Sequence, residues 1–199
     1  MDIQVGANKC NFTVHRDLLN FYSSYFQSAL GGSCKESEEN LIILPEDDPD
    51  VFELFVHWLY AQRFRQTDVT GLKTSRNMAR LYVFADMRGV LGLKDIVITG
   101  FVQHLKKGTL PVKHSLLREI PYIYANTAEK SLLRKLVVDY IAYDTAQEIK
   151  LGGFKEYLTA EFLLEVTLKM KESPKLLHAP YKINTCTYHE HETGPPCDA

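Results

Sequence analysis

The spacing of apolar residues changes along this 199-residue chain, and this change most constrains its fold. Strand-like patterns occur only before residue 45. Asp2 to Val5 and Phe12 to Val14 alternate polar and apolar residues, and Leu41 to Leu44 is a short apolar run that ends at Pro45. After Pro45 the apolar residues fall three and four positions apart, as on the buried face of a helix. A few strands followed by a run of helices predict an α+β fold.

Local signals predict where the helices begin and end. Ser23 can cap a second helix within residues 16–30, and Asp48 with Pro49 marks a helix start. Pro121 is expected to kink or break a helix over residues 116–125. Thr159 is a predicted N-cap. The helix after it is expected to turn four residues inward: Phe162, Leu163, Val166 and Met170.

Composition and charge exclude several classes of protein. The chain has 45% hydrophobic residues, enough for a globular core, and 23 Lys and Arg against 25 Asp and Glu give no field that would hold nucleic acid or an acidic membrane. No secretory signal or membrane span is recognisable, and four cysteines are too few for a disulfide scaffold. These features favour an intracellular protein of the cytoplasm and/or nucleus.

Several segments resemble the signature of the BTB/POZ family. The resemblance covers Asp2 to about Leu105, and further segments in the second half resemble a fungal-type subfamily of BTB proteins with a helical C-terminal extension. The matching segments are Phe12-Thr13-Val14-His15-Arg16-Asp17-Leu18-Leu19, Ser24-Tyr25-Phe26, Leu41-Ile42-Ile43-Leu44-Pro45, Phe55-x-x-Trp58-Leu59-Tyr60, Tyr122 to Thr127, Leu133 to Asp139 and Glu161-Phe162-Leu163.

This resemblance implies a BTB/POZ fold, a small mixed sheet flanked by a helical cluster, followed by an α-helical extension. The expected domains are a BTB/POZ domain over 1–108, a BACK-like helical extension over 109–173 and a polar tail over 174–199. The globular part is expected to end at Pro174.

Family members act as non-catalytic protein-interaction modules, which implies binding rather than turnover here. The sequence has no phosphate-binding Gly-x-x-x-x-Gly-Lys, His-Glu-x-x-His or Gly-x-Ser-x-Gly motif, so no enzyme is expected. The resemblance implies an adaptor, with substrate recruitment to a cullin-type ubiquitin ligase as one use. The alternative is a transcription-associated assembly factor that acts through a DNA-binding partner.

In relatives that dock onto a cullin, an apolar residue two before an acid fills a pocket on the scaffold, and the matching residues are Cys34 and Glu36. Tyr60 and the helix after Pro111 would be the other contacts. Cys34 is smaller than the Phe or Met that suits such a pocket, so less apolar area would be buried. A plain solvated loop is therefore the competing interpretation of Cys34 and Glu36.

Two further expectations follow from the resemblance. Asp2 and Arg16, with His15 beside them, match a charged pocket in the family, and we expect this pocket to serve folding. Because Met1 directly precedes Asp2, no exchanged N-terminal strand is expected, which predicts a monomer or a weak homodimer. Self-association would then use apolar side chains expected to be exposed at three positions: Leu18, Leu19 and Tyr22.

The tail holds two thiols and two imidazoles, a set suited to tetrahedral zinc: Cys186, His189, His191 and Cys197. Their spacing is not one of the common zinc-finger spacings. A structural zinc site and a metal-free tail both remain open, and no other cofactor is expected.

Overall fold

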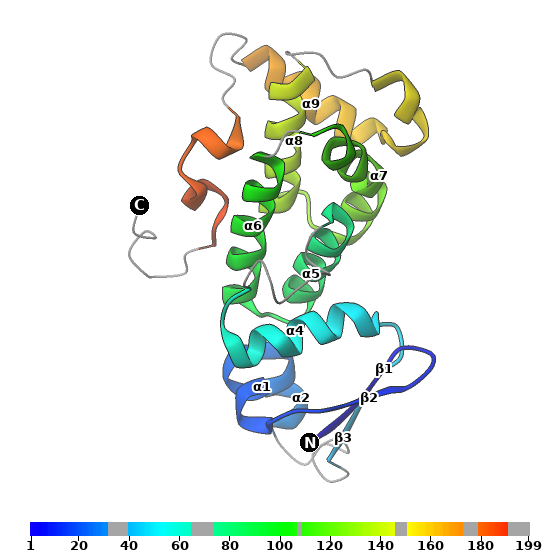
Figure 1. Ribbon diagram of the computed structural model, residues 1–199, viewed down its shortest axis with the longest axis vertical. Coiled ribbons are helices and arrows are strands. Elements are labelled where there is room, and N and C mark those ends of the chain that lie inside the picture. Colours follow the sequence, from blue (N-terminus) through cyan, green and yellow to red (C-terminus); the bar gives the residue numbers. More distant parts are fainter. Residues whose placement is uncertain (32–39, 65–73, 107–108, 146–150, 173–178, 191–199) are drawn as a thin grey trace. The chain divides into compact units, whose positions relative to one another are not determined.

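The computed structural model describes residues 1–31, 40–64, 74–106, 109–145, 151–172 and 179–190. These residues belong to two compact units, unit 1 with Met1–Lys73 and Arg80–Ile96 and unit 2 with Thr74–Ala79 and Val97–Ala199. Helices α5 (Ser75–Met87) and α6 (Leu91–Lys106) contribute residues to both units (Figure 1).

Unit 1 contains a three-stranded mixed sheet in the order β2-β1-β3. Strand β1 (Asp2–Val5) pairs antiparallel with β2 (Cys10–Thr13) and parallel with β3 (Leu41–Leu44). Ile3 and Val5 of the central strand are fully buried. The small mixed sheet and the α+β class predicted from the sequence are therefore confirmed.

The described helical segments of unit 1 are α1 (Arg16–Tyr22), α2 (Ser24–Leu30), α4 (Pro49–Ala61) and parts of α5 and α6. The predicted caps are present. The Ser23 hydroxyl accepts from the Phe26 N–H at 3.1 Å, and the Asp48 carboxylate accepts from the Asp50 N–H at 3.0 Å. The core is rich in aromatic rings, and Phe55 lies 5.6 Å from Phe52 and 5.1 Å from Phe84 between ring centroids.

A tight turn after α5 packs against the start of α2. The Ser23 hydroxyl donates to the Arg88 carbonyl at 2.6 Å, and Arg88 pairs with Asp47. Gly89 has φ +60°, and a Cβ there would overlap the Ser24 hydroxyl. Only glycine therefore combines this left-handed backbone with such a close approach.

Unit 2 is helical in its described part, and α8 is its centre. Helix α9 and the short η4 helix both pack on α8, and the buried side chains of α8 include Leu133, Leu136, Val137, Tyr140 and Ile141. The elements are α7 (Leu110–Asn126), α8 (Leu132–Thr145), η2 (Leu151–Tyr157), α9 (Ala160–Glu172), η3 (Pro180–Lys182) and η4 (Thr185–Tyr188).

The structure corrects some sequence expectations in unit 2. Pro121 does not break α7, because Leu117, Ile120 and Ile123 around it are buried and hold the helix by packing, whereas the expected kink stays a prediction. Leu163 is 39% exposed rather than on the inner face of α9. Packing also continues beyond Pro174, since Tyr188 is fully buried.

Candidate protein-interaction site

His15 and Tyr60 form a polar corner between α1 and α4. Tyr60 lies near the C-terminal end of α4 with its side chain 50% exposed, and its hydroxyl accepts from the His15 backbone N–H at 3.2 Å. The same hydroxyl lies 2.6 Å from Nδ1 of His15. Because the hydroxyl accepts from the main chain, its own proton can be donated to Nδ1. Two contacts from one residue hold the Tyr60 ring in place at the surface.

The exposed apolar residue of α1 is Phe21 rather than Leu19. Leu19 is fully buried, Leu18 and Tyr22 are half-buried, and Phe21 is 79% exposed. Tyr22 packs edge-on against Trp58 of α4, with 5.4 Å between ring centroids. The expectation that Leu19 lies at the surface is therefore wrong, because α1 turns this residue into the core.

Two residues of the expected charged pocket, Asp2 and Arg16, each make a hydrogen bond within unit 1. Asp2 accepts from the Thr13 hydroxyl at 2.8 Å across the β1–β2 pair. Arg16 donates to the Leu30 carbonyl at 2.6 Å, at the end of α2. Both contacts join elements of unit 1, in keeping with the expected structural role, which stays a prediction. Of the three docking residues expected, Cys34 and Glu36 lie outside the described residues.

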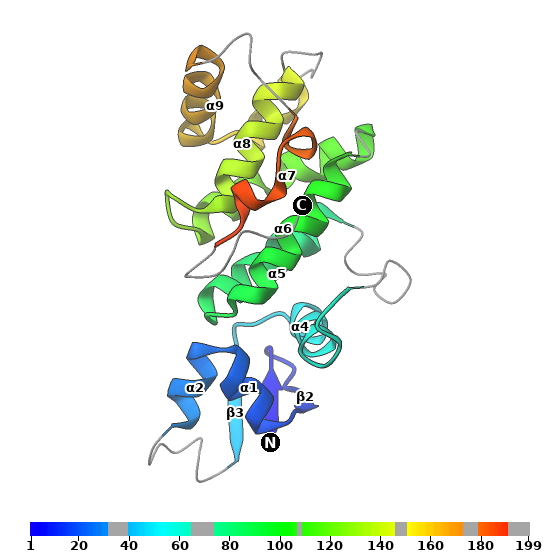
Figure 2. The same cartoon turned by 90° about the vertical axis from the view of Figure 1, so that its left-hand side faces the viewer.

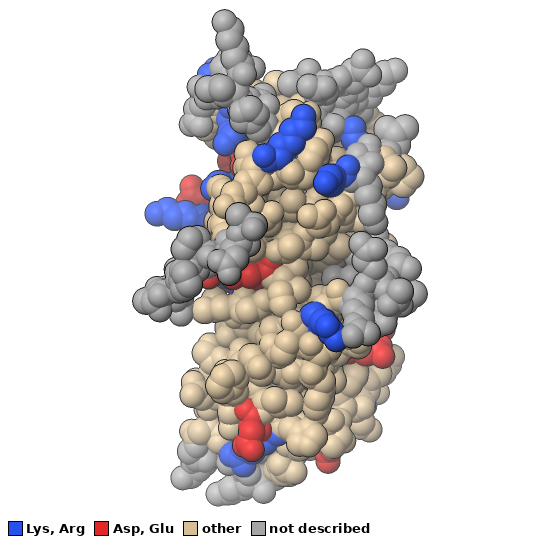
Figure 3. Space-filling view, turned by 60° about the vertical axis from the view of Figure 1, so that its left-hand side comes forward, with Lys and Arg blue, Asp and Glu red and all other residues tan. Residues whose placement is uncertain are grey.

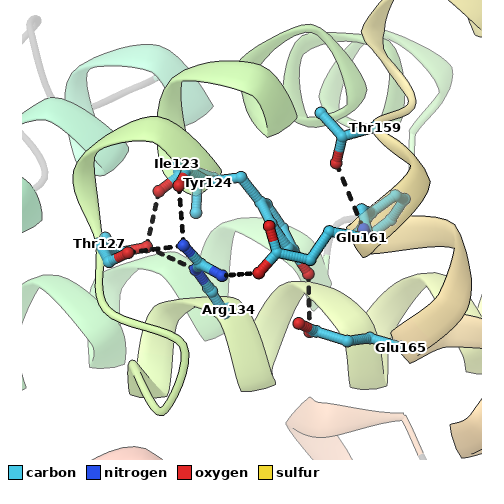
Figure 4. A network of polar contacts seen from close by, with 8 residues as sticks. Ile123, Tyr124, Thr127, Arg134, Thr159, Glu161 and Glu165 are labelled. Atoms are coloured by element: carbon cyan, nitrogen blue, oxygen red, sulfur yellow. Dashed lines mark hydrogen bonds and ion pairs between the residues drawn. The ribbon is translucent and has the colours of Figure 1, made fainter.

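Arg134 is the centre of a buried network in unit 2 (Figure 4). Its guanidinium donates to the carbonyls of Tyr124 at 2.7 Å and Thr127 at 2.6 Å, to the Thr127 hydroxyl at 3.0 Å and to the Glu161 carboxylate at 2.5 Å. Burial, aided by the hydrogen bond that the phenol donates to Glu165 at 2.7 Å, raises the pKa of Tyr124. One side chain on α8 thus caps the end of α7 and holds the first turn of α9.

Part of the segment predicted as a polar tail packs on α8 through Tyr188. Its hydroxyl donates to the Asp139 carboxylate at 2.9 Å, and Lys169 of α9 pairs with the same carboxylate at 2.8 Å. Burial and the adjacent negative charge of Asp139 raise the pKa of Tyr188. Asp139 therefore joins three segments of unit 2.

The structure describes two of the four expected zinc ligands. Cys186 lies in η4, and Nε2 of His189 is 2.9 Å from the Thr99 hydroxyl of α6. His191 and Cys197 lie outside the described residues. Within the described part of the chain, no three His, Cys, Asp or Glu side chains are grouped as metal ligands. The zinc site stays a prediction.

Among the described residues, no helix combines the length and the apolar character that a membrane span requires. On the face in Figure 3, described Lys and Arg side chains are separated by uncharged surface rather than gathered in one patch. This distribution offers no continuous basic surface on that face to a polyanion.

Sequence reasoning missed several exposed apolar residues, and three of them lie on helices α1 and α9: Phe21, Leu164 and Leu168. Phe21 follows directly on Asn20, on the outer side of α1. Leu164 and Leu168 are four residues apart, opposite the face of α9 that Phe162 occupies. The helical spacing of apolar residues assigns one buried face to each helix, and all three residues fall outside that face. Checking each apolar residue against it would therefore have identified them as exposed.

Comparison with known proteins identifies the class. The family model described as the BTB/POZ domain matches residues 1–104, more than half of the chain, and the chain belongs to this family. The BTB/POZ domain is a protein-interaction module and is typically non-catalytic. A human relative, Kelch repeat and BTB domain-containing protein 7, is 23% identical over 153 residues, which is 77% of this chain and 20% of that protein. The chain thus matches about a fifth of the relative's length.

Proposed function

We propose that the chain is an adaptor that docks onto a cullin scaffold through its BTB/POZ domain and presents a bound protein for ubiquitination. The observation that carries this proposal is the exposed, doubly held ring of Tyr60 at the end of α4. Aromatic residues fixed at a surface lose little conformational entropy on binding, so they are well suited to anchor an interface.

In this proposal, Cys34 and Glu36 supply the rest of the docking contacts. In this proposal the small Cys34 side chain fills its pocket only in part, so Tyr60 and Glu36 supply a larger share of the affinity. The contact would then be weaker than one anchored by Phe or Met at position 34. Cys34→Met is therefore expected to strengthen binding rather than weaken it.

Titration calorimetry with a recombinant cullin N-terminal domain tests the proposal. Tyr60→Ala and Glu36→Arg are each expected to weaken binding at least tenfold, roughly 1.4 kcal/mol. Glu53→Arg, a charge reversal at another exposed position of α4, is the matched control and should bind like the unmutated chain. Absence of binding by the unmutated chain would remove the proposal.

Tyr60→Phe separates the two contributions of this residue. The ring remains, whereas the hydrogen bonds to His15 are lost, so binding should weaken less than in Tyr60→Ala. Affinity purification from the native cell, followed by mass spectrometry, would then identify the protein that the adaptor carries. Recovery of a DNA-binding protein without any cullin would favour the transcription-associated alternative.

A further inference from the structure

Helix α9 packs on α8 with one face and leaves apolar residues exposed on the other. Phe162 and Val166 are buried, whereas Leu164 is 59% and Leu168 is 50% exposed. Figure 2 shows α9 at the edge of the helical unit, with α8 beside it on one side. These two exposed leucines, one turn apart, form an apolar ridge on the outer face of α9.

This ridge is part of a longer stripe, which we call the α9 seam: Glu161, Leu164, Leu168 and Lys171. These residues are separated by three, four and three positions, which is the spacing of the contact stripe in a two-helix coiled coil. An acid therefore begins the seam, two leucines fill its centre and a base ends it. The helix dipole favours an acid at the first turn and a base at the last, but it does not explain why both share one stripe with the leucines.

We propose that the α9 seam binds the α9 seam of a second copy of this chain, with the two helices antiparallel. Positions 161 and 171 lie equally far from the midpoint at 166, and so do positions 164 and 168. An antiparallel two-fold pair therefore places Glu161 opposite Lys171 of the second copy and Leu164 opposite Leu168 of the second copy. Each apolar residue meets an apolar residue, and each charge meets its opposite.

A parallel pair of α9 helices would bring like charges together. It would place Glu161 beside Glu161 and Lys171 beside Lys171, and like charges in contact oppose association. Charge complementarity thus selects both the second copy as the occupant and the antiparallel direction.

Both charged ends of the seam are accessible. Lys171 is exposed. Glu161 uses one carboxylate oxygen for Arg134, but its side chain remains 53% exposed, so the carboxylate can accept a second cation. Lys169, by contrast, lies on the inner side of the helix against Asp139 and takes no part in the seam.

The contact is expected to be weak. Three turns of one helix bury far less than the roughly 1,200–2,000 Å² of a stable interface. Association should therefore depend on concentration, and any other contact between copies would strengthen it through a higher effective concentration. The seam belongs to unit 2 and Tyr60 to unit 1, and the two proposals rest on different residues, so either can fail alone.

Cysteine cross-linking of the full chain tests the register. Leu164→Cys and Leu168→Cys chains are mixed in equal amounts under mild oxidation, and mass spectrometry assigns each disulfide, so that links through the four native cysteines are counted separately. We expect disulfides between positions 164 and 168 to exceed the 164–164 and 168–168 links, because only opposed positions bring the sulfurs within bonding distance. Predominance of 164–164 links, or no link at these positions, would overturn the proposal.

Sedimentation velocity tests the energetics. Leu168→Glu is expected to weaken self-association at least tenfold, whereas Gln103→Glu, which adds the same charge at an exposed position of α6, should have no effect. Lys171→Glu should reverse the salt dependence: salt screens an attraction in the unmutated chain and a repulsion in the variant. If Leu168→Glu leaves self-association unchanged, the two copies associate through another surface, and the proposal is overturned.

Discussion

Replacing Arg134 by Ala should destabilise unit 2 more than any change to its acidic partner. The guanidinium donates four hydrogen bonds, of which only one goes to the Glu161 carboxylate. Two others go to the carbonyls of Tyr124 and Thr127, which end α7 and have no further helical N–H to accept from. The variant therefore removes the cap of one helix as well as an ion pair.

The magnitude follows from these contacts. Each hydrogen bond from a charged donor contributes about 1.5–3 kcal/mol, and leaving a buried carbonyl without a donor costs about 1–3 kcal/mol. The four bonds do not add in full, because the desolvation penalty of burying Arg134 disappears and water can enter the vacated space. Because two carbonyls lose their donor, we expect a loss of about 2–5 kcal/mol for Arg134→Ala. Glu161→Gln should lose less than about 1 kcal/mol, since that side chain is half in water.

The assay must report on unit 2. The single tryptophan, Trp58, lies in unit 1, so its fluorescence follows the wrong part of the chain. Urea unfolding followed by far-ultraviolet circular dichroism, with hydrogen exchange of α8 peptides by mass spectrometry, measures the helices concerned. Equal losses for Arg134→Ala and Glu161→Gln would refute the capping argument, and a loss below about 1 kcal/mol for Arg134→Ala would refute the importance of the network.

Three further predictions concern other sites. Gly89→Ala should cost about 2–3 kcal/mol in urea unfolding, because it adds backbone strain and a clash with Ser24; Ser24→Ala should recover only the clash. Because the pKa of Tyr188 is raised above its ordinary 10.0, stability should fall as pH rises through about 10, where only the unfolded phenol ionises; Tyr188→Phe should flatten this fall, measured by urea midpoints. If zinc binds, metal analysis should find about one ion per chain, and Cys197→Ser should lower that ratio. Finding no zinc in protein that was purified without a chelator would exclude the site.

Features that depend on neighbouring residues were predicted well. The caps at Ser23, Asp48 and Thr159 need only a side-chain oxygen and an amide two or three residues away, so the sequence pattern contains all the information. The strands before Pro45 were recognisable for the same reason. The family resemblance then supplied the overall fold, which spacing alone does not specify.

Features that depend on distant residues were missed. Tyr188 lies in a polar segment with a Pro before it, and nothing nearby indicates that Asp139, 49 residues earlier, will accept its hydroxyl proton. Pro121 was expected to disturb its helix because a lost hydrogen bond is a local property, whereas the burial that holds α7 together comes from packing. Of the candidate docking site, Tyr60 was predicted, but its contact with His15 was not, since 45 residues separate them.

The exposed apolar residues also suggest how the two proposed surfaces can be separated. Tyr60 belongs to unit 1 and Leu168 to unit 2, and neither is part of a buried core. Tyr60→Ala and Leu168→Glu should therefore each weaken one interaction at least tenfold and leave the other intact. If the surfaces act independently, the double variant should show the same loss of cullin binding as Tyr60→Ala and the same loss of self-association as Leu168→Glu. A different loss of cullin binding in the double variant would mean that self-association changes the affinity for the cullin, and by thermodynamic linkage the cullin would then change self-association by the same factor.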